Sequence, residues 1–177
     1  MNPAFDFQPT LTGSLVTLRP LQARDYGALA SAASDPLIWE QHPDARHERA
    51  IFDVFFEQAL TSGGALVALE IRTGAVIGTS RFHSRDIAPV GLEIGWTFLA
   101  RPYWGGVYNG EMKRLMLEHA FRFEDHVVLL VAPQNVRSQR AVQKIGGQFQ
   151  EQLTEGRDQG YLVYRVDRAS WAPTERR

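Results

Sequence analysis

Two hydrophobic periodicities alternate along the chain and predict its strands and helices. From Gly91 to Phe98 every second residue is large and apolar, which is typical of a β-strand. From Glu111 onward the apolar positions recur three and four residues apart, which predicts a helix. The segment between them contains residues that break both patterns: Pro102, Gly105, Gly106 and Gly110. We therefore expect a strand that runs through a glycine-rich turn into a helix.

The same periodicities predict the rest of the chain as one mixed α/β domain over residues 1–177. Strands are expected over residues 14–21, 65–72, 75–83, 127–131, 148–153 and 161–166, and helices over residues 23–33, 50–60 and 136–145. The run at 127–131 is apolar throughout, which is typical of a strand buried on both faces. Residues 35–49 contain two prolines and are expected to form a loop or a broken helix. We expect residues 1–12 and 172–177 to fray.

Composition and charge narrow the classes of function. The chain has 177 residues, of which 44% are hydrophobic and 22% charged, as is typical of a globular domain. Its formal net charge of −1 offers no basic surface for nucleic acid, so no nucleic-acid partner is expected. The absence of cysteine excludes thiol nucleophiles and disulfides. With no signal-peptide pattern and no apolar run that could span a membrane, the chain is expected to be cytoplasmic, with no membrane partner.

The glycine-rich turn is a candidate anion site. The first turn of a helix presents unpaired N–H groups and a partial positive charge, and glycine lets an anion approach the backbone closely. A phosphate or pyrophosphate is the expected ligand. The alternative is an ordinary connection between a strand and a helix, which needs one glycine more often than three.

Four segments of the chain carry a resemblance to a known family. They are LVTLRPLQARDY at 15–26, GLEIGWTFLARPYWGG at 91–106, GEMKRLMLEHAF at 110–121 and NVRSQRAVQKIGG at 135–147. In this order and at these spacings they resemble the GNAT superfamily of N-acetyltransferases, most closely the branch that contains the ribosomal-protein-alanine N-acetyltransferases. The resemblance implies a GNAT-like α/β (α+β) fold. Its sheet would be mixed and mostly antiparallel, with about seven strands, splayed central strands and about four flanking helices.

The resemblance also implies acetyl-CoA as co-substrate. Its pantetheine arm would lie along the fourth strand, which begins at Gly91, and its pyrophosphate on the glycine-rich turn. The implied cofactor-binding residues are Thr97, Phe98, Leu99, Trp104, Gly105, Gly106, Val107, Tyr108, Asn109, Gly110, Asn135, Ser138 and Arg140. The chain departs from the family pattern at four positions. Val107 and Asn109 replace a glycine and a small residue of the usual loop, Val142 replaces a tyrosine that acts as general acid in many members, and Gly147 replaces an aromatic residue.

Glu93 is the first candidate for a general base. Acetyl transfer requires a neutral amine, so a base or a chain of waters must remove the proton of the ammonium group. Glu93 lies on the strand expected to carry the cofactor, and partial burial there would raise its pKa. The alternative is a carboxylate that faces solvent or pairs with Arg81 on the neighbouring strand. Glu40, His83 and bulk solvent are the other candidates for this role.

Ser138 is the second catalytic candidate, and this assignment rests on the resemblance. In similar enzymes the matching serine lies near the cofactor sulfur and can donate a proton to the leaving thiolate. The alternative is a serine that satisfies the amides of its own helix. Asn135 is likewise either a cofactor contact or a helix N-cap. Arg140, with Arg137 and Lys144, either meets the 3′-phosphate of CoA or belongs to a solvated helix face.

The acceptor pocket is expected beside the irregular segment at 35–49, which shapes this pocket in similar proteins. The expected substrate-binding residues are Trp39, Glu40, His42, His83 and Trp96. Aromatic side chains in this segment can stack on an apolar acceptor, and Glu40 can hold its cation. His42 and His47 do not have helical i, i+4 spacing and lack a third ligand, so no metal is expected.

The leading hypothesis is an acetyl-CoA-dependent N-acetyltransferase that acetylates a primary amine by direct attack on the thioester. The departures at Val107, Asn109 and Val142 motivate an alternative, a catalytically weak CoA-binding or sensing domain of the same fold. A methyltransferase fits less well, because its glycine-rich turn would follow an early parallel strand. The acceptor is expected to be a protein N-terminus or a small-molecule amine, and the protein a monomer or homodimer.

Overall fold

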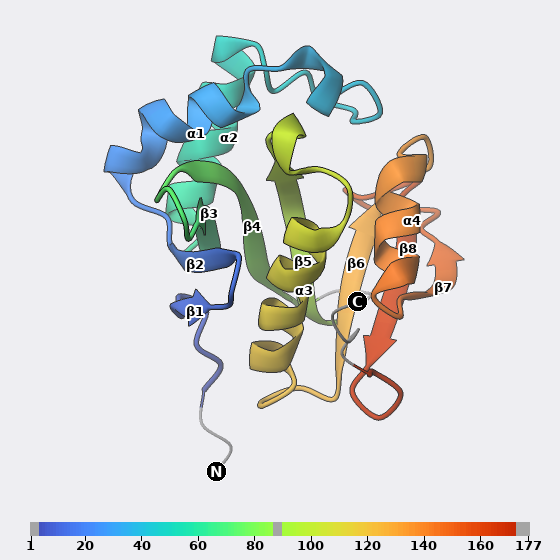
Figure 1. Cartoon of the computed structure of the whole chain (residues 1–177). Coiled ribbons are helices and arrows are strands. Elements are labelled where there is room, and N and C mark those ends of the chain that lie inside the picture. The colour runs from blue at the N-terminus through green and yellow to red at the C-terminus, as the bar shows by residue number, and fades with distance from the viewer. Residues whose placement is uncertain (1–3, 87–89, 173–177) are drawn as a thin grey trace.

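The strands form one mixed sheet, with helices packed on both of its faces (Figure 1). The computed structural model describes residues 4–86 and 90–172, and within them the sheet has eight strands. The strands are β1 (Leu11–Thr12), β2 (Val16–Pro20), β3 (Ala65–Glu70), β4 (Val76–Arg85), β5 (Gly91–Leu99), β6 (His126–Val131), β7 (Gln148–Gln152) and β8 (Leu162–Asp167). The helices are α1 (Tyr26–Ala33), α2 (Arg49–Thr61), α3 (Val107–Ala120) and α4 (Val136–Lys144), with 3-10 helices η1 (Ala23–Asp25), η2 (Pro36–Ile38) and η3 (Arg101–Tyr103). The expected architecture is confirmed, and the short β1 is the additional strand.

Strands β5 and β6 separate at the middle of the sheet. The strand order is β1-β2-β3-β4-β5-β6-β8-β7, and β5–β6 is the one parallel pair among the described strands. Its register contains two residue pairs, Leu92 with Val127 and Glu93 with Val128. Beyond Glu93 the edge of β5 that faces β6 has no partner strand. This divergence is the splayed centre that was expected, and it leaves backbone groups of β5 available to a ligand.

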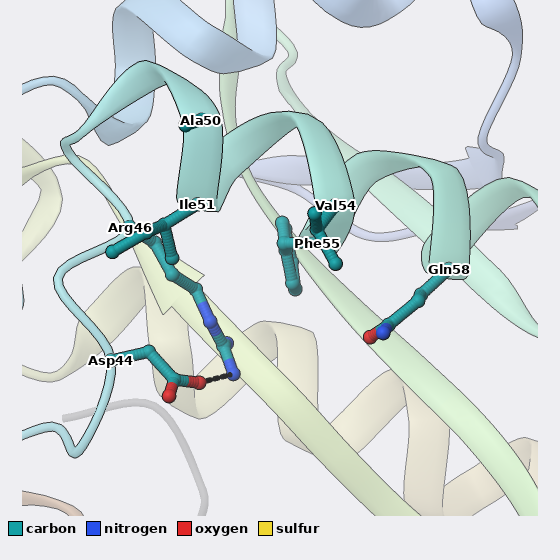
Figure 2. A pocket seen from close by; sticks show the side chains of 7 residues that line it. All are labelled: Asp44, Arg46, Ala50, Ile51, Val54, Phe55 and Gln58. Carbon is teal, nitrogen blue, oxygen red and sulfur yellow. Dashed lines mark hydrogen bonds and ion pairs between the residues drawn. The ribbon is translucent and has the colours of Figure 1, made fainter.

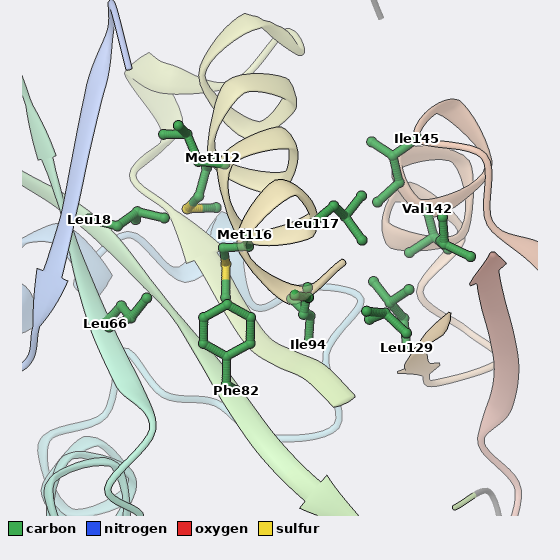
Figure 3. Packing of buried hydrophobic residues seen from close by; sticks show 14 of the residues in the cluster. Leu18, Leu66, Phe82, Ile94, Met112, Met116, Leu117, Leu129, Val142 and Ile145 are labelled. Carbon is green, nitrogen blue, oxygen red and sulfur yellow. The ribbon is translucent and has the colours of Figure 1, made fainter. Parts of the chain in front are cut away.

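Hydrophobic side chains fill both faces of the sheet because strand residues alternate between them. On one face, Met112 of α3, Val142 of α4 and Leu66 of β3 belong to one hydrophobic cluster (Figure 3). On the other face, Phe55 of α2 packs with Val67, the next residue of β3. Helices α3 and α4 therefore cover one side of the sheet, and α1 and α2 cover the other.

Strand β5 contains a β-bulge that the regular alternation did not predict. Trp96 has a φ of 50°, and the register between β4 and β5 shifts beside it. The extra residue reverses the faces of the side chains that follow. Leu92 and Ile94 pack on the α3 side, whereas Phe98 belongs to the core beneath α1 and α2. The predicted alternation from Gly91 to Phe98 is therefore wrong beyond Ile94.

Helix α3 begins at Val107 and not at Glu111, where the apolar periodicity placed its start. Gly105 and Gly106 precede it with φ values of 105° and 112°, a backbone region that favours glycine. Gly110 lies within the first turn, where its N–H donates to the carbonyl of Gly106 at 2.7 Å. In the first turn Tyr108 packs on the core four residues before Met112, but Val107 is 63% exposed and Gly110 interrupts the apolar pattern, which obscured the helix start.

Part of the N-terminal segment that was expected to fray is packed on the domain. The ring of Phe5 lies edge-on to Phe82 with 5.2 Å between centroids. Nε2 of His119 lies 2.8 Å from the carbonyl oxygen of Asp6. Residues 4–12 are thus anchored to β4 and α3, while residues 1–3 and 173–177 lie outside the described residues.

Glu111 joins α3 to the start of β2. Its carboxylate accepts hydrogen bonds from the amides of Ser14 (2.9 Å), Leu15 (2.6 Å) and Val16 (2.9 Å), and from the Ser14 hydroxyl (2.7 Å). Burial opposes ionisation of Glu111, but these four donors prevail and lower its pKa to about 2. This contact fixes the axis of α3, and with it the turn that precedes the helix.

Candidate active site

Free backbone donors are concentrated at the start of α3. In the part of the chain that the structure describes, the N–H groups from Gly105 to Asn109 donate to no protein acceptor. The helix dipole adds a partial positive charge at the same place. The side chain of Val107, where the family pattern has glycine, points outward with 63% exposure. Five consecutive free amides at a helix start fit a phosphate or pyrophosphate group.

Side chains beneath the turn hold it in place. The hydroxyl of Tyr108 donates to the carboxylate of Glu70 at 3.0 Å, and that of Tyr103 donates to the same group at 3.4 Å. Nε1 of Trp104 donates to the carbonyl of Leu99 at 2.8 Å. The polar side-chain groups of Tyr108 and Trp104 are therefore engaged within the protein. The N–H of Trp104 also donates to the carbonyl of Arg101 at 3.0 Å, so the free amides begin at Gly105.

Lys113 supports the bulge of β5 from the α3 side. Its Nζ donates to Oγ1 of Thr97 at 2.5 Å and lies 3.3 Å from Oγ of Ser80, and the two hydroxyls are 2.7 Å apart. Burial lowers the pKa of Lys113 to about 7, and the negative charge of Glu93 partly opposes this effect. Thr97 is an expected cofactor residue, and its side chain is thus hydrogen-bonded to α3. This bond fixes β5 beyond the point where it separates from β6.

Glu93 is buried at the point where β5 and β6 separate, and it is 4% exposed. Its Oε2 accepts from Nη1 of Arg85 at 2.9 Å, while Nη2 of Arg85 donates to Asp158 at 2.8 Å. Burial raises the pKa of Glu93, although the ion pair with Arg85 opposes the rise. The expected direction of the shift is confirmed. Both alternatives are wrong, because Glu93 does not face solvent and its bonded partner is Arg85 and not Arg81.

Trp39 forms a wall of the core beside the expected acceptor pocket. Its Nε1 donates to the carbonyl of Ala33 at 2.7 Å, and its ring lies 5.1 Å from that of Phe98. Glu40 is exposed. His42 packs edge-on against Trp39, and burial lowers its pKa to about 4, so its imidazole is neutral at pH 7.

His83 and Trp96 meet on the face of the sheet that α2 covers. Their rings lie edge-on with 5.6 Å between centroids, and the guanidinium of Arg81 lies 4.5 Å from the Trp96 ring centre. His83 is exposed as a whole residue, but its ring is partly buried. This partial burial and the positive charges of Arg85 and Arg81 lower its pKa. These contacts bring together His83 and Trp96, two of the expected substrate-binding residues. The candidate base Glu93 lies opposite His83 in the strand register.

The start of α4 carries the second catalytic candidate. Oδ1 of Asn135 accepts from the amide of Ser138 at 3.0 Å, which confirms Asn135 as the N-cap. The Ser138 hydroxyl is partly exposed and has no hydrogen-bond partner among the described residues. Arg140 is exposed. The Ser138 hydroxyl is therefore available to a ligand, whereas the Asn135 oxygen is already engaged.

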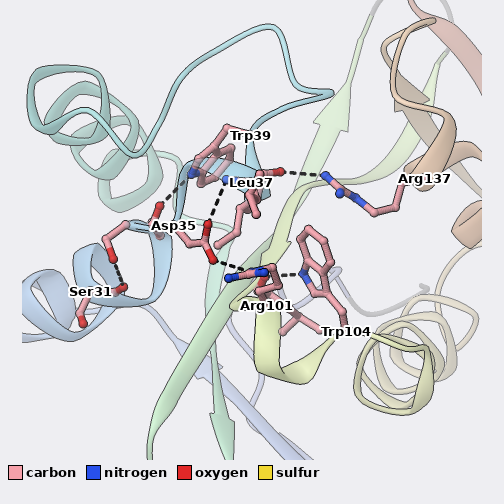
Figure 4. A network of polar contacts seen from close by, with 11 residues as sticks. Ser31, Asp35, Leu37, Trp39, Arg101, Trp104 and Arg137 are labelled. Carbon is pink, nitrogen blue, oxygen red and sulfur yellow. Dashed lines mark hydrogen bonds and ion pairs between the residues drawn. The ribbon is translucent and has the colours of Figure 1, made fainter.

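A polar network connects three segments beside the splayed strands (Figure 4). Nη2 of Arg137 donates to the carbonyl of Ile38 at 2.9 Å, and its guanidinium lies 4.1 Å from the Trp104 ring centre. Asp35 accepts from Nε of Arg101 at 2.6 Å. These contacts join α4, the loop after α1 and the end of β5.

A cavity of about 390 Å³ runs along α2 (Figure 2). Its lining is mainly apolar, with one ion pair at its end: Asp44, Arg46, Ala50, Ile51, Val54, Phe55 and Gln58. Nη2 of Arg46 donates to Asp44 at 2.9 Å, and the guanidinium lies 4.5 Å from the Phe55 ring centre. None of its lining residues belongs to the glycine-rich turn or to the start of α3.

Residues 4–86 and 90–172 contain no group of three or more histidine or acidic side chains placed to hold a metal ion. No helix in these residues is long and apolar enough to cross a membrane.

The family model of the acetyltransferase (GNAT) domain matches residues 16–148, which span the sheet from β2 to the start of β7. The chain belongs to the GNAT acetyltransferases. The family uses acetyl-CoA as co-substrate, and the free amides before α3 and the open edge of β5 suit its pyrophosphate and pantetheine groups. A search of curated protein sequences finds no significant match.

Solved structures support the same fold. A GCN5-related N-acetyltransferase from Brucella melitensis is 18% identical, with 97% of this chain and 82% of that chain covered and a TM-score of 0.79. An acetyltransferase from Agrobacterium tumefaciens is 27% identical, with coverages of 90% and 95% and a TM-score of 0.73. Mycobacterium smegmatis RimJ, solved with CoA-disulfide, is 19% identical, with coverages of 93% and 90% and a TM-score of 0.67.

The sequence did not identify three residues that shape the site of this GNAT acetyltransferase. Arg85 and Asp158 hold Glu93, and Lys113 supports the bulge. Arg81, which was considered as a partner of Glu93, lies over Trp96. The alternating spacing of Arg81, His83 and Arg85 was a signal, because it places all three side chains on one face of β4. Val142, at the usual tyrosine position, is buried in the core, so it supplies no proton donor.

Proposed function

We propose that this protein transfers the acetyl group of acetyl-CoA to a primary amine by direct attack on the thioester. The acceptor class is a protein N-terminal amine or a small-molecule amine. The observation that carries the proposal is the buried carboxylate of Glu93, held by Arg85 at the point where β5 leaves β6. A buried base beside an open strand edge is suited to deprotonate an amine next to a bound thioester.

In this proposal the amides from Gly105 to Asn109 bind the pyrophosphate of acetyl-CoA. The pantetheine arm then follows β5 from Leu99 toward Gly95, along the edge that β6 leaves open. Arg140 lies on the exposed face of α4 and would meet the 3′-phosphate of CoA. This placement delivers the thioester to the bulge at Trp96, within the region of Glu93.

Glu93 removes a proton from the acceptor ammonium, directly or through water. The free amine attacks the thioester carbonyl to form a tetrahedral intermediate, and collapse of this intermediate breaks the C–S bond and releases CoA. As the C–S bond breaks, the attacking nitrogen loses its second proton. The Ser138 hydroxyl, which has no other partner among the described residues, passes a proton to the thiolate and is reprotonated by the proton that the nitrogen releases, so CoA leaves as the thiol. The raised pKa of Glu93 favours proton capture near neutral pH.

A panel of amines tests the proposal. Purified protein with acetyl-CoA is assayed for free CoA against peptides with free N-termini, amino acids, polyamines and aminoglycosides. Release of CoA that depends on one acceptor class, together with an acetylated amine detected by mass spectrometry, supports the proposal. Binding of acetyl-CoA without turnover of any amine favours a CoA-binding domain, the function suggested by the buried Val142.

A further inference from the structure

Arg81 is a buried arginine with one unpaired edge. The residue is 6% exposed, and its Nε and Nη2 atoms are buried without a hydrogen-bond partner in the described structure. The N–H groups of these two atoms lie side by side on one edge of the planar guanidinium, in the geometry that receives both oxygens of a carboxylate. Burial of unpaired charged donors is unfavourable. This edge therefore matches a planar anion with two acceptor oxygens.

The neighbouring arginines differ from Arg81 because each has a carboxylate partner. Arg85 bonds to Glu93 at 2.9 Å, and Arg46 bonds to Asp44 at 2.9 Å. Neither carboxylate is hydrogen-bonded to Arg81. Burial and the nearby charge of Arg46 together lower the pKa of Arg81 to about 10, although the charge of Glu93 opposes them. An anion bound between Arg81 and Arg46 would offset both the burial of the Arg81 charge and its repulsion by Arg46.

Arg81 also lies where the acceptor must approach the thioester. It pairs in register with Gly95, the residue before the bulge, and two residues further on His83 pairs with Glu93. Residues two apart on a strand share a face, as do residues paired across strands. The side chains of Arg81 and Glu93 therefore lie on one face of the sheet, beside Trp96.

We propose that the acceptor is a small amine that also carries a carboxylate, which Arg81 binds through Nε and Nη2. This inference rests on the proposed function and specifies its substrate class. With the carboxylate on Arg81, the amine lies toward Glu93, which removes its proton. The carboxylate keeps its charge throughout, so the chemistry of acetyl transfer is unchanged. Such an acceptor is a zwitterion with no net charge. It fits this face of the sheet, which carries arginine as well as carboxylate side chains.

Trp96 packs against the guanidinium of Arg81. Its ring lies 4.5 Å from the guanidinium carbon and is partly exposed. Its φ of 50° places it in a backbone conformation that is uncommon for a residue other than glycine. The proposal requires this partly exposed ring to move toward solvent when a carboxylate binds the enclosed donors. Binding of the correct acceptor therefore changes the tryptophan fluorescence, and Trp96→Phe removes most of that change.

Matched acceptors test the inference. Each of several amino acids, together with β-alanine and γ-aminobutyrate, is compared with its carboxamide, which keeps the shape and removes the negative charge. We expect at least one acid to exceed its carboxamide by about 10-fold or more in kcat/KM, because a charged group left unpaired in a buried site is strongly disfavoured. Arg81→Met should abolish this preference by slowing the acid, with little change for the carboxamide. Arg81→Lys should recover part of it, since lysine keeps the charge but not the fork.

Two further measurements separate binding from a structural role. Arg81→Met should leave the free energy of unfolding unchanged or higher, because it removes an unpaired buried cation. Its Kd for acetyl-CoA should match that of wild type and of Arg165→Met, a control at a partly exposed arginine of β8. Equal rates for acids and carboxamides, or a uniform loss on all acceptors with a destabilised fold, would overturn the inference and leave the proposed function standing. No CoA release with any amine would overturn both.

Discussion

Arg85 and Glu93 form a buried ion pair across β4 and β5, with 2.9 Å between Nη1 and Oε2. The strand register opposes Glu93 to His83, so Arg85 reaches it diagonally from two residues further along β4. The second amino group of Arg85 bonds to Asp158, which comes from the turn between β7 and β8. Arg85 of the neighbouring strand, itself held by a residue 73 positions further along the chain, therefore fixes the Glu93 carboxylate beside the splayed strands.

Replacement of Glu93 by glutamine should reduce turnover while acetyl-CoA binding is kept. Glutamine preserves the size of the side chain but cannot accept the proton, so kcat should fall by about 10²- to 10⁴-fold. The loss should be smaller for a weakly basic amine, which is already neutral at assay pH. Steady-state kinetics with amines of different pKa provide the measurement, and Glu118→Gln on the exposed face of α3 is the control. Unchanged turnover would transfer the role to Glu40, His83 or solvent.

The pH dependence of the rate gives a second signature of Glu93. Burial raises the pKa of this carboxyl above its ordinary value of 4.5. A general base must be deprotonated, so kcat/KM should fall as pH decreases through the raised pKa. This acidic limb should be absent from the residual activity of Glu93→Gln. A limb of the same position in both proteins would assign the titration to another group.

The glycine pair before α3 should control cofactor affinity. Gly106 has a φ of 112°, so Gly106→Ala strains the turn and displaces the amides that follow it. We expect the Kd for acetyl-CoA to rise by about 10-fold or more, the loss of about 1.4 kcal/mol of binding free energy. Gly63→Ala is the matched control, since Gly63 has a φ of 66° at the end of α2, far along the chain from the site. If both variants bind acetyl-CoA equally well, the pyrophosphate is bound elsewhere.

Lys113 should make the stability of the protein depend on pH. Its pKa is about 7 in the folded protein and 10.5 as an ordinary lysine, so the unfolded chain binds one more proton between these values. The free energy of unfolding should therefore rise with pH over this range, by up to about 1.4 kcal/mol per pH unit from this group alone. Lys113→Met should lose this slope. Urea unfolding at pH 7, 8 and 9 measures it, and the same slope in both proteins would contradict the assignment.

Much of the fold could be predicted because local patterns and tertiary structure agree. The apolar run from Val127 to Val131 forms the expected buried strand, and Asn135 caps the helix that follows it. The start of α3 was missed because Gly110, which lies in its first turn, interrupts the apolar pattern, although Tyr108 packs on the core four residues before Met112. Gly105 and Gly106 indicated the turn but could not indicate where the helix begins.

The site was less predictable because its contacts depend on register and distance in sequence. The bulge at Trp96 has no local sequence signal, yet it decides which face Phe98 occupies. Asp158 lies 73 residues from Arg85, so no spacing could indicate that they pair. Sequence similarity identified the family, but the partner of the candidate base required the structure.

Asn135 and Ser138 allow the capping and catalytic roles at the start of α4 to be separated. Asn135→Ala removes the acceptor for the Ser138 amide and should cost about 1 kcal/mol of stability, whereas Asn135→Asp keeps a capping oxygen and should cost less. Ser138→Ala should leave the melting temperature unchanged, because its hydroxyl has no hydrogen-bond partner among the described residues. Its kcat should fall by less than about 100-fold, since water can replace a hydroxyl as proton donor to the thiolate. Thermal unfolding and kinetics of the three variants measure these effects. A Ser138→Ala variant that melts earlier but keeps full kcat would make Ser138 a structural residue of α4.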